Sequence, residues 1–68
     1  DYQMAYHWWT EAANAGNADA QYNLGIMYLN GKGVEKDSLE GKRWLTDAAD
    51  QGHTKAQYCL GVMYSTGK

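Results

Sequence analysis

The sequence has no proline and no phenylalanine, and it contains a single cysteine, Cys59. One cysteine cannot form a disulfide within the chain, and no group of thiols is present to hold zinc. No apolar run approaches the ~20 residues that a membrane-spanning helix needs, and neither a signal peptide nor a lipidation signal is visible. The sequence therefore predicts no membrane insertion, no metal and no other cofactor.

An excess of positive charge is also lacking, because six basic residues stand against eight acidic ones, for a net charge of -2. A partner made of nucleic acid or anionic lipid needs a basic surface, so we expect neither. The composition is 44% hydrophobic and 13% aromatic, which is too rich for a disordered tail. We expect one small folded unit of marginal stability, since a domain of this size buries only about 60% of its unfolded surface.

The strongest feature of the sequence is an internal repeat. A shift of 36 positions places residues 1–32 over 37–68 without a gap, and 15 of the 32 pairs are identical. A period in the mid-thirties is typical of arrays of paired helices.

Apolar spacing within each copy predicts two kinds of helix. The first kind, over 2–15 and 38–51, has one apolar face, which we expect to be buried. These faces hold Ala5, Trp8, Trp9, Ala12 and Ala13, and then Gly41, Trp44, Leu45, Ala48 and Ala49. The second kind, over 18–30 and 54–66, has two apolar faces, so it must be covered on both sides or present one of them to a ligand. On 18–30 one face holds Ala20, Leu24, Met27 and Tyr28, and the nearly opposite one holds Tyr22, Ile26 and Leu29.

Local signals mark the ends of these helices. Gly16 and Gly52 stand where a left-handed residue usually ends a helix. Capping boxes are expected at 37–40 and 54–57, begun by Asp37 and Thr54. The glycines at 25 and 61 lie in helix interiors, where they cost ~1 kcal/mol relative to alanine, and we expect a neighbouring helix to cross closely at each.

None of the residues with chemical potential forms a catalytic pattern. The pair His7 and Glu11 lacks further metal ligands, and His53 lacks a nucleophile and an orienting group. The segment 31–33, Gly-Lys-Gly, lacks the spacing of a phosphate-binding loop, and Cys59 lacks a neighbouring base. We predict that the chain is not an enzyme and that its tryptophans belong to the core rather than to a sugar-stacking platform.

The segment 20–28 (Ala-Gln-Tyr-Asn-Leu-Gly-Ile-Met-Tyr), followed by Gly31-Lys-Gly-Val34, Asp37, Trp44, Ala48-Ala49 and Gly52, resembles the Sel-1-like repeat. This repeat is a relative of the tetratricopeptide repeat. The resemblance implies an all-α fold, a right-handed α-solenoid of antiparallel helix pairs, with a half repeat at 1–17, a complete repeat at 18–52 and a half repeat at 53–68. Gly41 departs from the family, which usually has alanine there, and the lone Cys59 excludes the paired cysteines of one branch.

By the same resemblance, the chain is expected to be a non-catalytic scaffold for a protein or peptide partner and part of a longer, bacterial array. The compartment, cytoplasm or periplasm, stays open. We expect the concave face to bind the partner. Its candidate residues are Asp19, Tyr22, Asn23, Ile26, Leu29, Asn30, Lys55, Tyr58, Val62 and Thr66.

Two alternatives to this function remain, a module that binds cell-wall glycan or peptidoglycan and, less favoured, a β-lactamase-like hydrolase. Apolar residues at both ends of the chain also predict that the ends are covered, either by further repeats or by end-to-end self-association.

Overall fold

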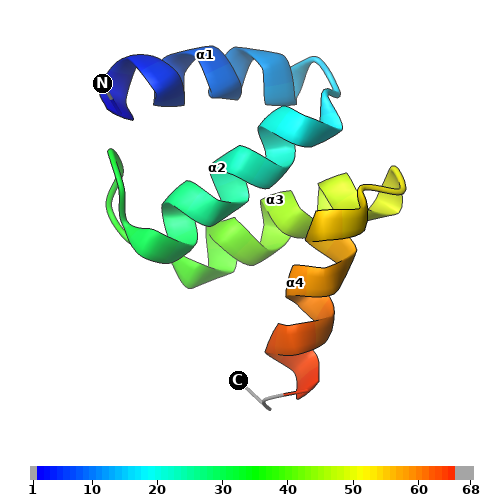
Figure 1. Cartoon of the computed structure of the whole chain (residues 1–68). Helices are drawn as coiled ribbons and strands as arrows, with labels where there is room; N and C mark the ends of the chain where they lie inside the picture. The colour runs from blue at the N-terminus through cyan, green and yellow to red at the C-terminus, as the bar shows by residue number, and fades with distance from the viewer. Residues whose placement is uncertain (1, 66–68) are drawn as a thin grey trace.

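A computed structural model describes the backbone of residues 2–65 and the side chains of residues 4–65. Four helices follow one another: α1 (Tyr2–Asn14), α2 (Ala18–Asn30), α3 (Ser38–Asp50) and α4 (Thr54–Ser65). Each packs against the next, and the chain advances from α1 at one end to α4 at the other (Figure 1). The described residues contain no strand. The predicted all-α, right-handed solenoid of helix pairs is therefore confirmed, and the predicted helix ends agree to within one residue.

The turn between α1 and α2 and the turn between α3 and α4 are built alike. Gly16 and Gly52 have φ of 96° and 87°, as predicted, because glycine adopts left-handed backbone without a Cβ penalty. The next residue in each turn, Asn17 or His53, sends its N–H back to the carbonyl of Ala12 (3.0 Å) or Ala48 (3.1 Å). This pattern is the Schellman motif, which satisfies carbonyls at the helix end.

The same two residues then cap the following helices. Asn17 Oδ1 accepts the N–H of Ala20 at 3.0 Å, and His53 Nδ1 accepts the N–H of Ala56 at 3.2 Å. The predicted capping box at 54–57 is therefore wrong, because the cap lies one residue earlier, at His53. An imidazole nitrogen can take this role because it is a hydrogen-bond acceptor, as the amide oxygen of Asn17 is.

At the start of α3, half of the predicted capping box is present. Asp37 Oδ1 accepts the N–H of Glu40 at 3.1 Å. The N–H of Asp37 donates to the carbonyl of Tyr28 at 2.9 Å, so the reciprocal bond from Glu40 is replaced by a link to the end of α2.

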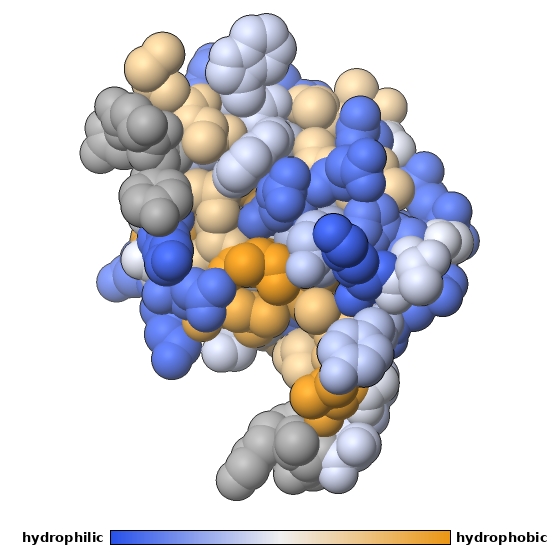
Figure 2. Space-filling model, viewed as in Figure 1, coloured by the Kyte–Doolittle hydropathy of each residue, from blue (hydrophilic) through white to orange (hydrophobic). Residues whose placement is uncertain are grey.

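Helix α2 contributes to two hydrophobic clusters on its opposite sides. One side packs against α1, through Ala20, Leu24 and Met27 with Ala13. The other side packs against α3 and α4 through Tyr22, Ile26 and Leu29, whose neighbours include the buried Leu45 and Leu60. Both apolar faces of α2 are thus covered at least in part, and the second is covered by the following helices rather than by the preceding one. Figure 2 shows hydrophobic residues gathered over the crossing of α2 and α3, with further ones on α4.

Helices α2 and α3 cross at two glycines. A Cβ on Gly25 would lie 2.7 Å from Leu45 Cγ and 3.0 Å from the Gly41 carbonyl oxygen, and a Cβ on Gly41 would lie 2.8 Å from the Gly25 carbonyl oxygen. The predicted close approach at Gly25 is confirmed. At Gly61, its counterpart in α4, a Cβ would meet no atom of the described chain within 4 Å, so the predicted crossing there is not present.

Trp8 corrects the predicted inward face of α1. Trp8 is 69% exposed, whereas Trp9 and Trp44 are partly buried against the hydrophobic cluster between α1 and α2. Trp44 packs back against the preceding repeat, and Trp8 occupies the equivalent position in α1, where no preceding helix is described. The position is apolar because of the repeat, and its burial depends on the neighbour.

Side-chain amides connect successive turns of the array. Gln21, which is only 6% exposed, donates from Nε2 to the Ala13 carbonyl (3.1 Å), and its Oε1 accepts from Gln51 Nε2 (2.9 Å). Gln57 repeats the first of these bonds, to the Ala49 carbonyl at 3.1 Å. The amide of Gln21 thereby links the ends of α1 and α3, and both its nitrogen and its oxygen have a hydrogen-bond partner.

Candidate functional site

Two adjoining hollows form a continuous surface, which we call the inner groove. The larger, about 580 Å³ in volume, is lined by Asp19, Tyr22, Asn23, His53, Thr54 and Lys55. The smaller, about 220 Å³, is lined by Trp9, Tyr22, Asn23, Ile26, Met27, Asn30 and Lys32. Tyr22 and Asn23 belong to both, so the groove passes over the middle of α2.

Six of the ten residues expected on the concave face line this groove: Asp19, Tyr22, Asn23, Ile26, Asn30 and Lys55. Leu29 does not line the groove. It packs against α3 beside Gly41, so closely that a Cβ added to Gly41 would contact its side chain. Tyr58 and Val62 are exposed on α4, 73% and 44%, and lie outside the groove. Thr66 lies outside the described residues.

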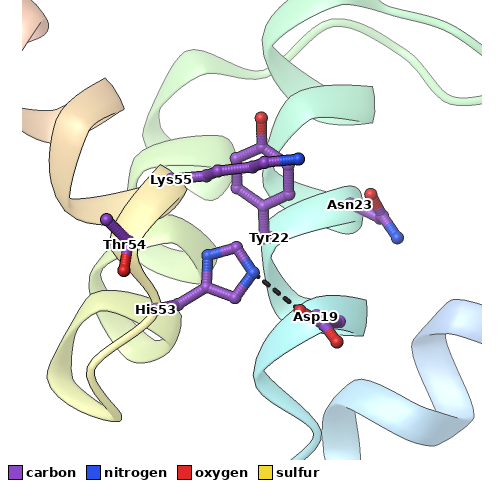
Figure 3. Close-up of a pocket in the computed structure, with 6 residues that line it drawn as sticks. All are labelled: Asp19, Tyr22, Asn23, His53, Thr54 and Lys55. Atoms are coloured by element: carbon purple, nitrogen blue, oxygen red, sulfur yellow. Dashed lines mark hydrogen bonds and ion pairs between the residues drawn. The ribbon is translucent and has the colours of Figure 1, made fainter.

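One wall of the larger hollow is centred on His53 (Figure 3). Its ring stacks on that of Tyr22, with centroids 4.9 Å apart and an interplanar angle of 21°. Its Nε2 lies 2.8 Å from Asp19 Oδ1. Because Nδ1 accepts the N–H of Ala56, the neutral ring carries its hydrogen on Nε2, which donates to Asp19. These contacts join the start of α4 to the first turn of α2.

Both ring nitrogens of His53 are thus hydrogen-bonded, which limits its use as a general base. A histidine that acts as general base needs a nitrogen lone pair directed at the proton it removes. Here the Nδ1 lone pair is taken by the backbone N–H of Ala56. The arrangement fixes a turn and orients the wall of a groove, and it offers no base to a nucleophile.

Tyr22 forms the floor shared by the two hollows. Burial, followed by the charge of Cys59 and a hydrogen bond with it, raises the pKa of Tyr22 above its ordinary value of 10.0. The phenol is therefore a neutral donor and acceptor throughout the physiological range. Cys59, a free cysteine, lies partly buried beside it.

A single line of side chains along α2 faces the groove: Asp19, Asn23, Ile26 and Asn30. At 3.6 residues per turn these four positions fall within about 60° of arc and extend about 16 Å along the axis. The side-chain amides of Asn23 and Asn30 have no hydrogen-bond partner among the residues that the structure describes. Within this line one unengaged amide lies on each side of Ile26, and Trp9, Tyr22 and Met27 add further apolar surface to the groove.

Across the larger hollow, Lys55 carries the positive charge, and Figure 3 shows its side chain extending across the hollow toward Asn23. No ion pair joins Lys55 to any residue in the described part of the chain. Asp19 is 86% exposed at its side chain and is the acidic group of the same hollow. The larger hollow thus holds one charge of each sign, and Lys32 adds a second positive side chain in the smaller hollow.

Some groove residues were not expected from the sequence. The residues predicted for the concave face did not include Trp9, Met27, Lys32, His53 and Thr54, and each of these lines the groove. The repeat held a signal for His53, because it occupies the position of Asn17, a common helix cap.

No group of three or more metal-ligating side chains lies together in the part of the chain that the structure describes. His7 and Glu11 pair at 3.3 Å on the exposed side of α1. No helix in the described part of the chain has both the length and the apolar character needed to cross a bilayer.

Comparison with known proteins agrees with the geometry. The family model described as Sel1 repeat matches residues 1–17, 18–53 and 54–68, which together make up the whole chain. A solved structure, "Crystal structure of Sel1 repeat protein from Oxalobacter formigenes", superposes with a TM-score of 0.97 and 40% sequence identity. The match covers 100% of this chain and 28% of that protein, so the chain spans less than a third of the length of its solved relative.

Proposed function

Because the chain belongs to the Sel1 repeat family, whose repeats generally mediate protein–protein interaction, we propose that it is a non-catalytic scaffold that binds a protein or peptide partner in the inner groove. The observation that carries this proposal is the unengaged polar chemistry of the groove, namely Asn23, Asn30 and Lys55 around Ile26. Polar groups fixed on rigid helices beside apolar surface are what specific recognition requires.

The test is capture of the partner by the protein and by surface variants that keep the fold. Asn23→Arg and Lys55→Glu change the groove without removing core side chains. Arg43→Glu on the outer side of α3 is the matched control, since Arg43 is exposed and outside the groove. We expect both groove variants to lose the partner captured by the wild-type protein and the control to retain it, with circular dichroism showing equal helix content. Retention by the groove variants and loss by Arg43→Glu would place the interaction on the other face.

A glycan-binding module is the second candidate, because Trp8 is exposed and Trp9 lines the groove. Aromatic rings stack on sugars only when a ring face is open. Sedimentation of the protein with purified peptidoglycan, compared for wild type and Trp8→Ala, separates this function from the first. Co-sedimentation that Trp8→Ala abolishes would support the glycan candidate.

We also propose that the end faces of this segment are covered by other helices, whether further repeats or a second copy stacked end to end. Met4 and Trp8 on α1 and Tyr58 and Val62 on α4 are exposed, and large apolar patches are uncommon on soluble proteins. If a second copy stacked its α1 on α4, Ala5 would take the position that Gly41 has where α2 and α3 cross. Because alanine carries a Cβ, this α1 would pack less closely on α4 than α3 packs on α2. Sedimentation of the 68-residue chain over a concentration series should show self-association, and a monomer that binds no hydrophobic dye would refute exposed, adhesive ends.

A further inference from the structure

The inner groove has features that decide which backbone conformation its partner adopts. Asn23 and Asn30 each offer a side-chain carbonyl and an NH₂ group that the described chain leaves unengaged. When a partner covers the groove, these groups lose their water. Each then weakens binding by a factor of about 5 to 150 unless the partner supplies hydrogen bonds.

A helical partner is poorly suited to this surface. The backbone groups of a helix are satisfied internally, and a helix that docks in a groove presents an apolar face. The groove has apolar surface from Ile26, Tyr22 and Met27 of α2 and from Trp9, but the amides of Asn23 and Asn30 interrupt it on either side of Ile26. Docking an apolar helix face there would bury both amides without partners.

An extended partner offers what the amides need. The N–H and C=O groups of an extended peptide are not paired within the peptide, so a side-chain amide can accept from one and donate to the other. Asn23 and Asn30 are seven residues apart, which is about 10.5 Å along the helix axis. Three residues of an extended peptide in the polyproline II conformation advance about 9.3 Å and return to the same face.

We propose, building on the proposed function, that the inner groove binds an extended peptide whose backbone is held by the side-chain amides of Asn23 and Asn30 at positions about three residues apart. The full line from Asp19 to Asn30, about 16 Å, then accommodates about five residues of a polyproline II peptide at about 3.1 Å each. One apolar side chain of the peptide lies against Ile26 between the two amides.

The test uses the protein and short random peptides displayed on phage as the probe. The best selected peptide is synthesised, and its affinity is measured by calorimetry for wild type, Asn23→Ala and Asn30→Ala. The control is Asn14→Ala, an exposed asparagine on α1 outside the groove. We expect each groove variant to weaken binding about five- to tenfold and the control to leave it unchanged.

A second measurement leaves the protein unaltered. Methylation of single peptide-bond nitrogens along the selected peptide should weaken binding at a backbone position facing Asn23 and at another about three residues away. The bound peptide should show no helical signal by NMR.

Three results would overturn this inference. They are a helical bound peptide, affinities of Asn23→Ala and Asn30→Ala equal to that of wild type, or failure of any peptide to bind. None of them decides the proposed function, because the partner-capture experiment with Asn23→Arg and Lys55→Glu tests the groove independently of the partner's backbone conformation. If those variants fail to capture a folded partner that the wild-type protein captures, the proposed function stands and the inference of an extended peptide is rejected.

Discussion

Replacing Gly25 and Gly61 in turn by alanine should change the stability of the chain in opposite directions. The two residues are equivalent in the repeat and both lie in helix interiors, α2 and α4. Alanine in a helix interior is more stable than glycine by about 0.5–1 kcal/mol, because it restricts the unfolded backbone. This gain is available at both positions, so the difference between them reports the surroundings alone.

The surroundings differ sharply. The new Cβ at Gly61 would meet no described atom within 4 Å, so Gly61→Ala should raise the free energy of unfolding by about 0.5–1 kcal/mol. At Gly25 it would lie 2.7 Å from Leu45 Cγ and 3.0 Å from the Gly41 carbonyl oxygen. Overpacking of this kind costs about 1–3 kcal/mol, which exceeds the helix gain. Gly25→Ala should therefore lower the free energy of unfolding by about 1 kcal/mol.

Urea unfolding followed by circular dichroism measures both changes. In a domain of this size 1 kcal/mol corresponds to about 4–8 °C in Tm, so the two variants should melt about 10 °C apart. Each glycine variant is the matched control of the other, since the chemical change is the same. Stabilisation by both variants would show that α2 and α3 do not cross as closely as the glycine contacts indicate. Destabilisation by both would show that another helix packs at Gly61, as in end-to-end association.

The remaining predictions concern packing, capping and ionisation. Trp44→Ala should lower Tm far more than Arg43→Ala, because truncating a packed tryptophan costs about 3 kcal/mol or more; equal melting temperatures would contradict the assigned faces. His53→Ala should cost about 1 kcal/mol in urea unfolding through the lost cap, and His53→Asn should recover most of it; no recovery would assign the loss to the Tyr22 stack instead. A hydrogen bond with Tyr6, followed by burial, raises the pKa of Tyr28 to about 12, so its share of stability should be complete below pH 10 and be lost as pH rises from 10 to 12. Ultraviolet titration should show this pKa falling in Tyr6→Phe, and an unchanged value would exclude the bond as its cause.

The fold was predictable because its determinants are local or periodic. A 36-residue period, helical spacing and left-handed glycines at 16 and 52 were sufficient to place four helices to within one residue. The side chains that cap helices were less predictable, because Asp, Thr, Asn and His at neighbouring positions all offer acceptors. Only the backbone of the turn decides which acceptor meets the free N–H groups, and it selects His53.

The environment of a repeated position depends on its neighbour, which the local sequence does not contain. Trp8 and Trp44 are identical and helically equivalent, yet one is 69% exposed and the other is partly buried. The groove was likewise predicted only in part. The stripe on α2 identified Tyr22 and Ile26, but the stacking of His53 on Tyr22 depends on how α4 packs beside α2.

Comparison of the two copies separates residues that build the array from residues that give the groove its chemistry. The buried residues of the described chain are Ala13, Ala20, Gln21, Leu24, Gly25, Met27, Gly41, Leu45, Ala48, Ala56 and Leu60. All of them except Gly41 and Leu45 have an identical residue 36 positions away, because each copy repeats most of the same contacts with its neighbours.

Three polar residues of the groove behave in the opposite way, whereas Lys32 is also a lysine in the second copy. Asp19 is replaced by Lys55 in the second copy, Asn23 by Cys59 and Asn30 by a threonine. A polar side chain that faces solvent or a partner is not required by the packing, so it can differ between copies without loss of fold. The unengaged amides thus occur only in the first copy, on α2. A partner that needs both amides can bind this segment in one register, although the helices that carry the groove are repeated.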